Sequence, residues 1–250
     1  ILLDVSPPYL KALVIEGALI FEDKNLELHT EYIMIRNGRL QIGTWEKPIQ
    51  SKITVTLYGS KMSRFLPHYG NKVIALREGI LDIHGKPVSH TWSRLDQTAD
   101  VGATQIILLD AVDWKVGDVF VIASTDHDHY HSEERTVKTI SVSGSKTTIT
   151  FDEPLKYKHY AGIQTFEGKV FEMRAEVGLL TRNVVIQGDE TSQANMYGVH
   201  IMTFSPDGDD SSIARISYTE IRQAGQAFNL GRYPIHYHLI GNVHQSYVVG

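Results

Sequence analysis

The feature that most constrains this chain is a repeated unit, in which a short aliphatic strand runs into a glycine and a second apolar stretch follows it. The unit occurs three times, around Gly17, Gly38 and Gly79. A related strand at residues 53–59 falls in the gap between the second and third units. The resulting period of about 20 residues is the size of one turn of a solenoid.

The glycines are expected to form the corners between these strands. Glycine adopts a positive φ without the cost, on the order of 1 kcal/mol or more, that a side chain adds there. Short strands joined at such corners predict a stack of coils that share a central column of aliphatic residues. Similar spacing also occurs in the hairpins of a β-sandwich or jelly roll, which is the alternative architecture.

The rest of the chain also consists of short strand patterns, without a long stretch of helical period. We therefore predict an all-β chain, in which a glycine-rich β domain is continuous with a right-handed parallel β-helix. The expected divisions are a glycine-cornered domain at 1–123, a connecting hairpin region at 124–175, and the first coils of the β-helix at 176–250, truncated at the C-terminus. Residues 143–146 are expected to join two strands as a hairpin.

Composition and charge argue against several functions. The formal net charge is −5, and Lys and Arg are scattered singly, so nucleic acid is not an expected partner. No apolar run reaches the roughly 20 residues needed to cross a bilayer, so no membrane span is expected in this segment. The chain has no cysteine, which excludes disulfides, thiolate nucleophiles and cysteine metal sites.

Several motifs, in a fixed order along the chain, resemble those of one known family. They are Ala12–Gly17, Leu40–Thr44, Leu81–Pro87, Val112–Asp118, Ala175–Asn183 and Gly225–His238. Together they are similar to the eight-glycine (G8-type) domain and the first parallel β-helix coils of the fibrocystin and fibrocystin-like proteins. The resemblance covers nearly the whole chain, and the ordered set is far more specific than any single motif.

The resemblance implies a non-catalytic structural or adhesive module of a large membrane-anchored protein, extracellular or at the cell surface, including that of cilia. Its expected partners are glycans, other extracellular proteins or further copies of itself. Two related proteins, transmembrane protein 2 and the cell-migration-inducing hyaluronan-binding protein, are linked to hyaluronan breakdown and carry an additional domain before the β-helix. The stretch between Ala123 and Glu176 is too short for that domain, which argues against the same activity here.

The alternative function is a carbohydrate-active enzyme, a hydrolase or lyase that shortens hyaluronan or a related glycan. Hydrolysis requires two carboxyl groups roughly 5 to 10 Å apart, and a lyase requires a base beside a charge that stabilises the enolate. Positions along the chain do not show which carboxylates converge, so no catalytic residue is assigned. The candidates are Glu172, Glu176, Asp189 and Glu220.

The densest polar cluster, residues 125–134, alternates histidine with aspartate. An extended strand would place these side chains on two faces, with His127, His129 and His131 on one and Asp126 and Asp128 on the other. Three imidazoles suit zinc and the carboxylates suit calcium. Same-face side chains lie about 6 to 7 Å apart, however, so they converge on one ion only if the segment bends. A solvated loop is the alternative.

A second cluster near the C-terminus combines arginine, tyrosine and histidine. In a strand, His236 and His238 would share one face, and the ring of Tyr233 could stack on a sugar ring. The sequence therefore predicts a glycan-binding surface formed by Arg232, Tyr233, His236, His238 and His200. In the alternative interpretation, these histidines hydrogen-bond neighbouring coils and fix the stack.

Overall fold

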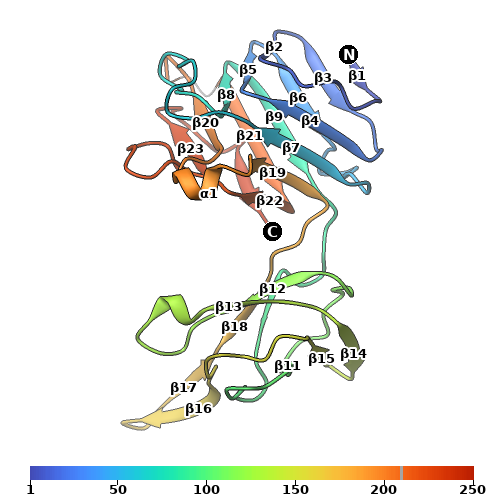
Figure 1. Ribbon diagram of the computed structural model, residues 1–250, viewed down its shortest axis with the longest axis vertical. Helices are drawn as coiled ribbons and strands as arrows, with labels where there is room; N and C mark the ends of the chain where they lie inside the picture. The colour runs from blue at the N-terminus through green and yellow to red at the C-terminus, as the bar shows by residue number, and fades with distance from the viewer. Residues whose placement is uncertain (209–210) are drawn as a thin grey trace. The chain divides into compact units, whose positions relative to one another are not determined.

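The computed structural model describes residues 1–208 and 211–250, and its regular secondary structure is almost entirely β-strand (Figure 1). The helical segments in this described part are η1 (His129–His131) and α1 (Ser192–Asn195). No helix among the described residues is long and apolar enough to cross a membrane. The chain forms two compact units: unit 1 comprises residues 1–87 and 182–250, and unit 2 comprises residues 88–181.

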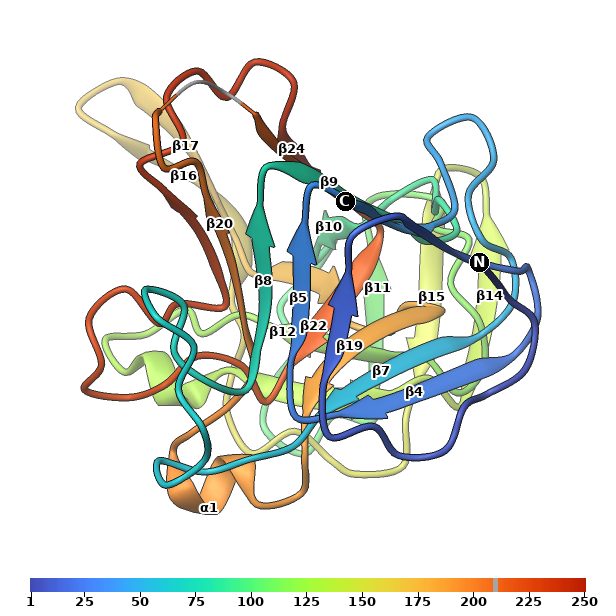
Figure 2. The same ribbon diagram turned by 90° about the horizontal axis from the view of Figure 1, so that it is seen from above.

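Unit 1 is a parallel β-helix, in which successive coils add strands to three parallel sheets. Sheet 1 contains β2 (Leu13–Ile15), β5 (Ile33–Arg36), β8 (Val73–Arg77), β20 (His200–Phe204) and β23 (Ile235–His238). Sheet 2 contains β1 (Leu2–Leu3), β3 (Ala18–Phe21), β6 (Arg39–Ile42), β9 (Gly79–His84), β21 (Ser212–Ser217) and β24 (Tyr247–Val249). Sheet 3 contains β4 (Leu26–Thr30), β7 (Ile53–Leu57), β19 (Val184–Gly188) and β22 (Thr219–Arg222). The predicted stack of parallel coils is confirmed, and Figure 2 shows β5 beside β8 and β4 beside β7.

The core of unit 1 is a set of aliphatic columns that run from coil to coil. One column on sheet 1 is formed by residues paired in register, namely Leu13, Ile33, Ile74, Ile201 and Ile235. Its three central members have no exposed surface. Each fully buried side chain of this kind stabilises the fold by about 1.5 to 3 kcal/mol, so the columns hold the coils together.

The glycines do lie at the corners, but for a different reason from the one expected. The positive φ belongs to the preceding residues, 50° at Asn37 and 53° at Glu78, whereas Gly38 and Gly79 lie outside the left-handed region. A Cβ at Gly79 would lie 2.4 Å from the carbonyl oxygen of Gly38, which is too close for any side chain. Glycine is therefore required here because the backbones of adjacent coils approach closely.

Unit 2 interrupts one coil of the β-helix, because it occupies the chain between β9 and β19. The sequence prediction described residues 124–175 as a connecting hairpin region and did not consider a compact unit at 88–181. The predicted ranges 1–123, 124–175 and 176–250 follow the chain in order, whereas unit 1 is assembled from two separated segments. The β-helix also begins well before residue 176, since β2 is already part of its stack.

Unit 2 is built from antiparallel strands around its own core. One sheet contains β10 (Trp92–Arg94), β18 (Glu176–Leu179), β12 (Val119–Ile122) and β13 (Glu133–Thr136), and a second contains β11 (Gln105–Leu108), β15 (Lys146–Thr150) and β14 (Thr139–Ser143). A two-stranded ribbon contains β16 (Ala161–Phe166) and β17 (Lys169–Arg174). The predicted hairpin is confirmed, because β14 and β15 pair from Ser143 and Lys146 onward.

Asn183 joins the two chain segments at the point where unit 1 is interrupted. Its Oδ1 accepts a hydrogen bond of 2.7 Å from the backbone N–H of Lys86, on the other side of the insertion. Its Nδ2 donates to the carbonyl oxygens of Ile49 and Ser51, both at 2.8 Å. One side chain therefore ties the departing strand, the returning strand and the preceding coil together.

Candidate functional site

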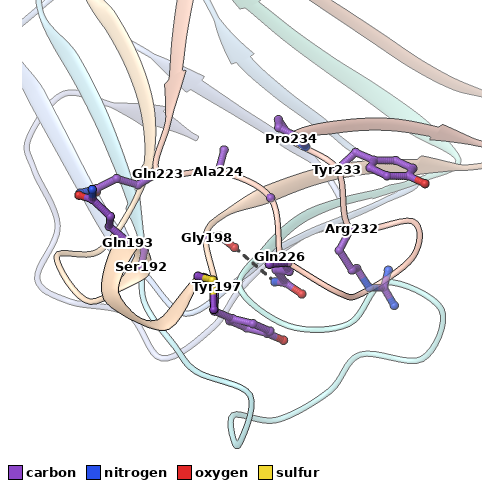
Figure 3. A pocket seen from close by; sticks show the side chains of 13 residues that line it. Ser192, Gln193, Tyr197, Gly198, Gln223, Ala224, Gln226, Arg232, Tyr233 and Pro234 are labelled. Atoms are coloured by element: carbon purple, nitrogen blue, oxygen red, sulfur yellow. Dashed lines mark hydrogen bonds between the residues drawn. The ribbon is translucent and has the colours of Figure 1, made fainter. Parts of the chain in front are cut away.

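Two of the five residues predicted to bind glycan line a cavity of ≈ 600 Å³ in unit 1 (Figure 3). Arg232 and Tyr233 come from the loop before β23, and Ser192, from α1, lies on the opposite side of the cavity. Gln226 also lines it, and its Nε2 donates to the carbonyl oxygen of Gly198 at 3.3 Å. The cavity is thus formed by segments that follow sheet 3 and precede sheet 1.

His200 has no exposed surface, so it cannot touch a glycan in this conformation. Its Nε2 lies 2.8 Å from the carbonyl oxygen of Tyr69, and its Nδ1 lies 3.2 Å from Nε2 of Gln226. These partners fit a neutral ring that donates from Nε2 and accepts at Nδ1. Burial lowers the pKa of His200 to about 4, against which the hydrogen bond to Tyr69 acts only weakly. His200 therefore supports the neighbouring loops from inside.

Arg232 is partly buried and ties one loop to sheet 1. Its Nη1 donates to the carbonyl oxygen of His68 at 3.0 Å and contacts Sδ of Met202 at 3.4 Å. A Cβ at Gly70 would lie 2.9 Å from Nε of Arg232, so the guanidinium packs directly on that backbone. Arg232 is therefore held in place, and it contributes positive charge beside the exposed rings described next.

The remaining predicted residues, Tyr233, His236 and His238, belong to an accessible cluster of rings on the outer side of sheet 1. The ring centroids of Tyr233 and His236 are 5.4 Å apart, and those of His236 and His238 are 5.1 Å apart. The cluster continues across the sheet, because Phe204 lies 5.5 Å from His238 and stacks on His68 at 5.6 Å. We call Tyr233, His236, His238, Phe204 and His68 the aromatic strip.

The charge of the aromatic strip depends on pH. Burial lowers the pKa of His238, and the neighbouring His236, Arg232 and His68 lower it further. This histidine is therefore neutral at pH 7, where the guanidinium of Arg232 supplies the positive charge. Protonation in acid would add charge to the same surface.

A buried network beside the cavity was not predicted from the sequence. Lys72 is buried, and its Nζ donates to Oδ2 of Asp189 at 3.0 Å, to Oγ of Ser192 at 2.8 Å and to the carbonyl oxygen of Gly59 at 3.2 Å. The three N–H groups of the ammonium are thereby occupied, so this lysine cross-links the structure and is not arranged as a general base. A lysine directly before the apolar run Val73-Ile74-Ala75-Leu76 is the signal that could have revealed it.

Two of the carboxylates considered for catalysis, Asp189 and Glu172, are each bound by neighbouring side chains. Burial raises the pKa of Asp189, but bonds from Thr191 and Lys72 outweigh it, and the pKa falls below its usual value. Glu172, in unit 2, forms ion pairs with Arg94 and Arg174. Asp189 and Glu172 are therefore each held by partners within their own unit.

The histidine-rich loop of unit 2 is not an extended strand, as the alternation suggested, because η1 occupies His129–His131. Asp126 contacts His131, with Oδ2 2.7 Å from Nδ1, while His127 and His129 are exposed. The ring of His131 also stacks on Tyr157 at 3.8 Å. In the parts of the chain that the structure describes, no three His, Asp or Glu side chains converge in a geometry that could hold a metal ion. Zinc or calcium binding by this loop, including Asp128, stays a prediction.

Comparison with known proteins identifies both parts of the β-helix. The model of the G8 domain matches residues 1–96, and the model of the CEMIP beta-helix matches residues 196–250. Fibrocystin-L of Homo sapiens is 43% identical over 287 residues, and fibrocystin-L of Mus musculus is 42% identical over 289 residues, in both cases across the whole of this chain. A G8 domain-containing protein of Dictyostelium discoideum is 34% identical over 235 residues, which cover 92% of this chain and 15% of that protein.

The chain spans 7% of the length of the two fibrocystin-L proteins. The sequence motifs, the stack of parallel coils and these similarities agree with one another. The chain belongs to the family of fibrocystin-like proteins, as a segment that joins a G8 domain to a parallel β-helix.

Proposed function

We propose that this chain is a non-catalytic structural and adhesive module of a large cell-surface protein, and that it binds glycans on the aromatic strip. The stacked coils supply a rigid support, because each rung is fixed by its neighbours in register. A site on strands is held more precisely than one on loops, which suits recognition of a repeating polymer. The proposal places the module outside the cell.

The observation that carries the proposal is the run of accessible rings from Tyr233 through His236 and His238. Such rings offer apolar faces for the C–H groups of sugars, and polar edges for hydroxyl groups. Arg232 lies beside them and attracts anionic substituents such as carboxylate or sulfate. An anionic glycan therefore fits this surface better than a neutral one.

The pH dependence follows from the charge of the strip. The pKa of His238 is lowered, so acidification gives this ring its proton below the ordinary histidine range near 6.5. Affinity for an anionic glycan is therefore expected to increase between pH 7.5 and pH 5. It should also fall with added salt, since exposed charges are screened over about 10 Å at 0.1 M ionic strength.

The test is a binding titration by calorimetry with hyaluronan, chondroitin sulfate and heparan sulfate fragments at pH 7.5 and pH 5. The variants Tyr233→Ala and His236→Ala/His238→Ala should weaken binding at least tenfold. Phe228→Ala is the matched control, because this ring is 92% exposed in the same loop but lies outside the strip. Equal loss in the control, or no binding by the unmodified protein, would refute the proposal.

The same samples test the alternative of a glycan depolymerase. Polymer length is measured by size-exclusion chromatography after prolonged incubation. A non-catalytic module leaves the length unchanged, whereas shortening that requires this protein would show that the chain is an enzyme.

A further inference from the structure

A second cavity, of ≈ 620 Å³, lies on the outer side of sheet 2. It crosses β6, β9, β21 and β24, and the loop after β6 forms one side. We call it the sheet 2 cleft and define it by Arg39, Trp45, Glu46, Asp82, Arg215 and Tyr247. It shares no residue with the aromatic strip, and the sequence motifs did not single it out as a site.

The floor of the cleft is a row of polar residues on adjacent strands. Asp82 pairs in register with Arg215, and Arg215 pairs with Tyr247. Asp82 is 3% exposed, with Oδ2 3.1 Å from Nη2 of Arg39 and Oδ1 3.3 Å from Nη1 of Arg215. A buried carboxylate in this position fixes the two guanidinium groups, whose remaining N–H groups are donors with set directions.

Asp82 is ionised despite its burial. Burial alone would raise the pKa of Asp82, but the adjacent His84, Arg215 and Arg39 together lower it. The ring of His84 is itself fixed, because Nδ1 lies 2.9 Å from Oγ of Ser217 and Nε2 lies 3.7 Å from Oδ1 of Asp82. His84 is only 2% exposed, so it holds the carboxylate of Asp82 in place and is not available to a ligand.

Aromatic rings form the wall of the cleft. Trp45 is 54% exposed, and its ring meets that of Tyr247 edge-on, with centroids 5.7 Å apart and an interplanar angle of 80°. His84 supports both rings, at 6.5 Å from Trp45 and 6.0 Å from Tyr247. An exposed indole that is held by neighbouring rings presents one broad apolar face, and it loses little conformational entropy when a ligand packs on it.

The formal charges in the cleft cancel. Arg39 and Arg215 carry two positive charges, and Asp82 and Glu46 carry two negative charges. A polyanion would meet two carboxylates, and a cation would meet two guanidinium groups, so both are disfavoured. Fixed donors and acceptors beside an apolar ring face instead suit a neutral ring that bears hydroxyl groups.

We propose that the sheet 2 cleft binds a neutral pyranose, with the sugar ring stacked on Trp45 and its hydroxyl groups bonded to the exposed carboxylate of Glu46 and the partly exposed guanidinium of Arg215. This site differs in place and in ligand charge from the aromatic strip, so it does not depend on the proposed function. A pyranose with two adjacent hydroxyl groups can donate one proton to the carboxylate and accept one from the guanidinium. The chain would then recognise two kinds of sugar on two sheets.

The experiment titrates the intact chain with neutral oligosaccharides of glucose, galactose, mannose and N-acetylglucosamine. The indole N–H signal of Trp45 is followed by NMR, and affinity is measured by saturation transfer to the ligand. We expect a saturable shift of Trp45, with no shift of Trp92, which is 52% exposed in unit 2. Trp45→Ala should weaken binding at least tenfold, Trp45→Phe should retain most of it, and Trp92→Ala should leave it unchanged.

The result for the sheet 2 cleft can be distinguished from the result for the aromatic strip. The variant His236→Ala/His238→Ala should keep its affinity for the neutral sugar, even if it loses anionic glycans. The proposal is overturned if no neutral oligosaccharide gives a saturable shift of Trp45, if Trp45→Ala binds as well as the unmodified chain, or if Trp45 responds only to anionic glycans. Unchanged circular dichroism of the variants shows that they are folded.

Discussion

Lys72 and Asp189 form a buried ion pair, with 3.0 Å between Nζ and Oδ2 and 117 positions between them in the chain. Lys72 directly precedes β8 and Asp189 directly follows β19, so the pair joins the beginning and the end of the coil that unit 2 interrupts. The pair therefore closes a coil whose two parts are far apart in sequence.

Replacing Lys72 should destabilise unit 1 strongly. Lys72→Met leaves the carboxylate of Asp189 buried without its cation, and removing one partner of a buried pair costs about 3 to 5 kcal/mol. The free energy of unfolding in urea, followed by circular dichroism, measures the loss. Lys24→Met is the control, since its ion pair with Glu22 is exposed and should contribute little to stability. A similar loss in both variants would contradict the assignment.

Alanine substitutions at Gly79 and Gly17 should show at which corner the close approach of adjacent coils requires glycine. Gly79→Ala places Cβ against the carbonyl oxygen of Gly38, and overpacking of this kind costs about 1 to 3 kcal/mol. A Cβ at Gly17 meets nothing within 4 Å, so Gly17→Ala should leave the melting temperature unchanged or slightly raised. Equal melting temperatures for the two variants would show that the close approach is unimportant.

Unit 1 should lose stability in acid because His200 resists protonation. Its pKa is about 4 when folded and about 6.5 when unfolded, so the unfolded chain binds the proton first as pH falls. Stability is therefore complete above pH 6.5 and decreases toward pH 4, by about 3 kcal/mol for this group. Urea unfolding at several pH values should show a smaller decrease for His200→Gln over this range. An identical slope would refute the prediction.

The contact between His131 and Asp126 should weaken at high pH and also at low pH. The hydrogen bond to Asp126 raises the pKa of His131, and the same bond lowers the pKa of Asp126. The contact is complete between about pH 4 and pH 6.5, weakens as pH rises through the pKa of His131, and weakens as pH falls through that of Asp126. An NMR titration of the His131 ring checks this, and Asp126→Asn should lower its pKa.

Much of the fold follows from the sequence, because the aliphatic rungs and their glycine corners repeat with a solenoid period. The insertion could not be foreseen, since the pairing of β7 with β19 joins residues that are far apart in the chain. The source of the positive φ was also misjudged. Asn37 and Glu78 adopt it, whereas the glycine after each is required by the close approach of the adjacent coil.

The candidate site was predicted in part. Alternation predicted that His236 and His238 share one face of a strand, and both lie in β23 with ring centroids 5.1 Å apart. It could not distinguish them from His200, whose burial arises from Tyr69 and Gln226, in segments distant along the chain. The same alternation in Leu81-Asp82-Ile83-His84 would have indicated the sheet 2 cleft, but its partners become neighbours only when the coils stack.

The hydrogen bond from Lys86 to Asn183 places the exit and the return of the chain side by side. A module attached through two chain segments that meet at one point can be lengthened, exchanged or lost without altering the register of any rung. The place of this insertion therefore leaves the supporting framework of coils intact whatever the size of unit 2.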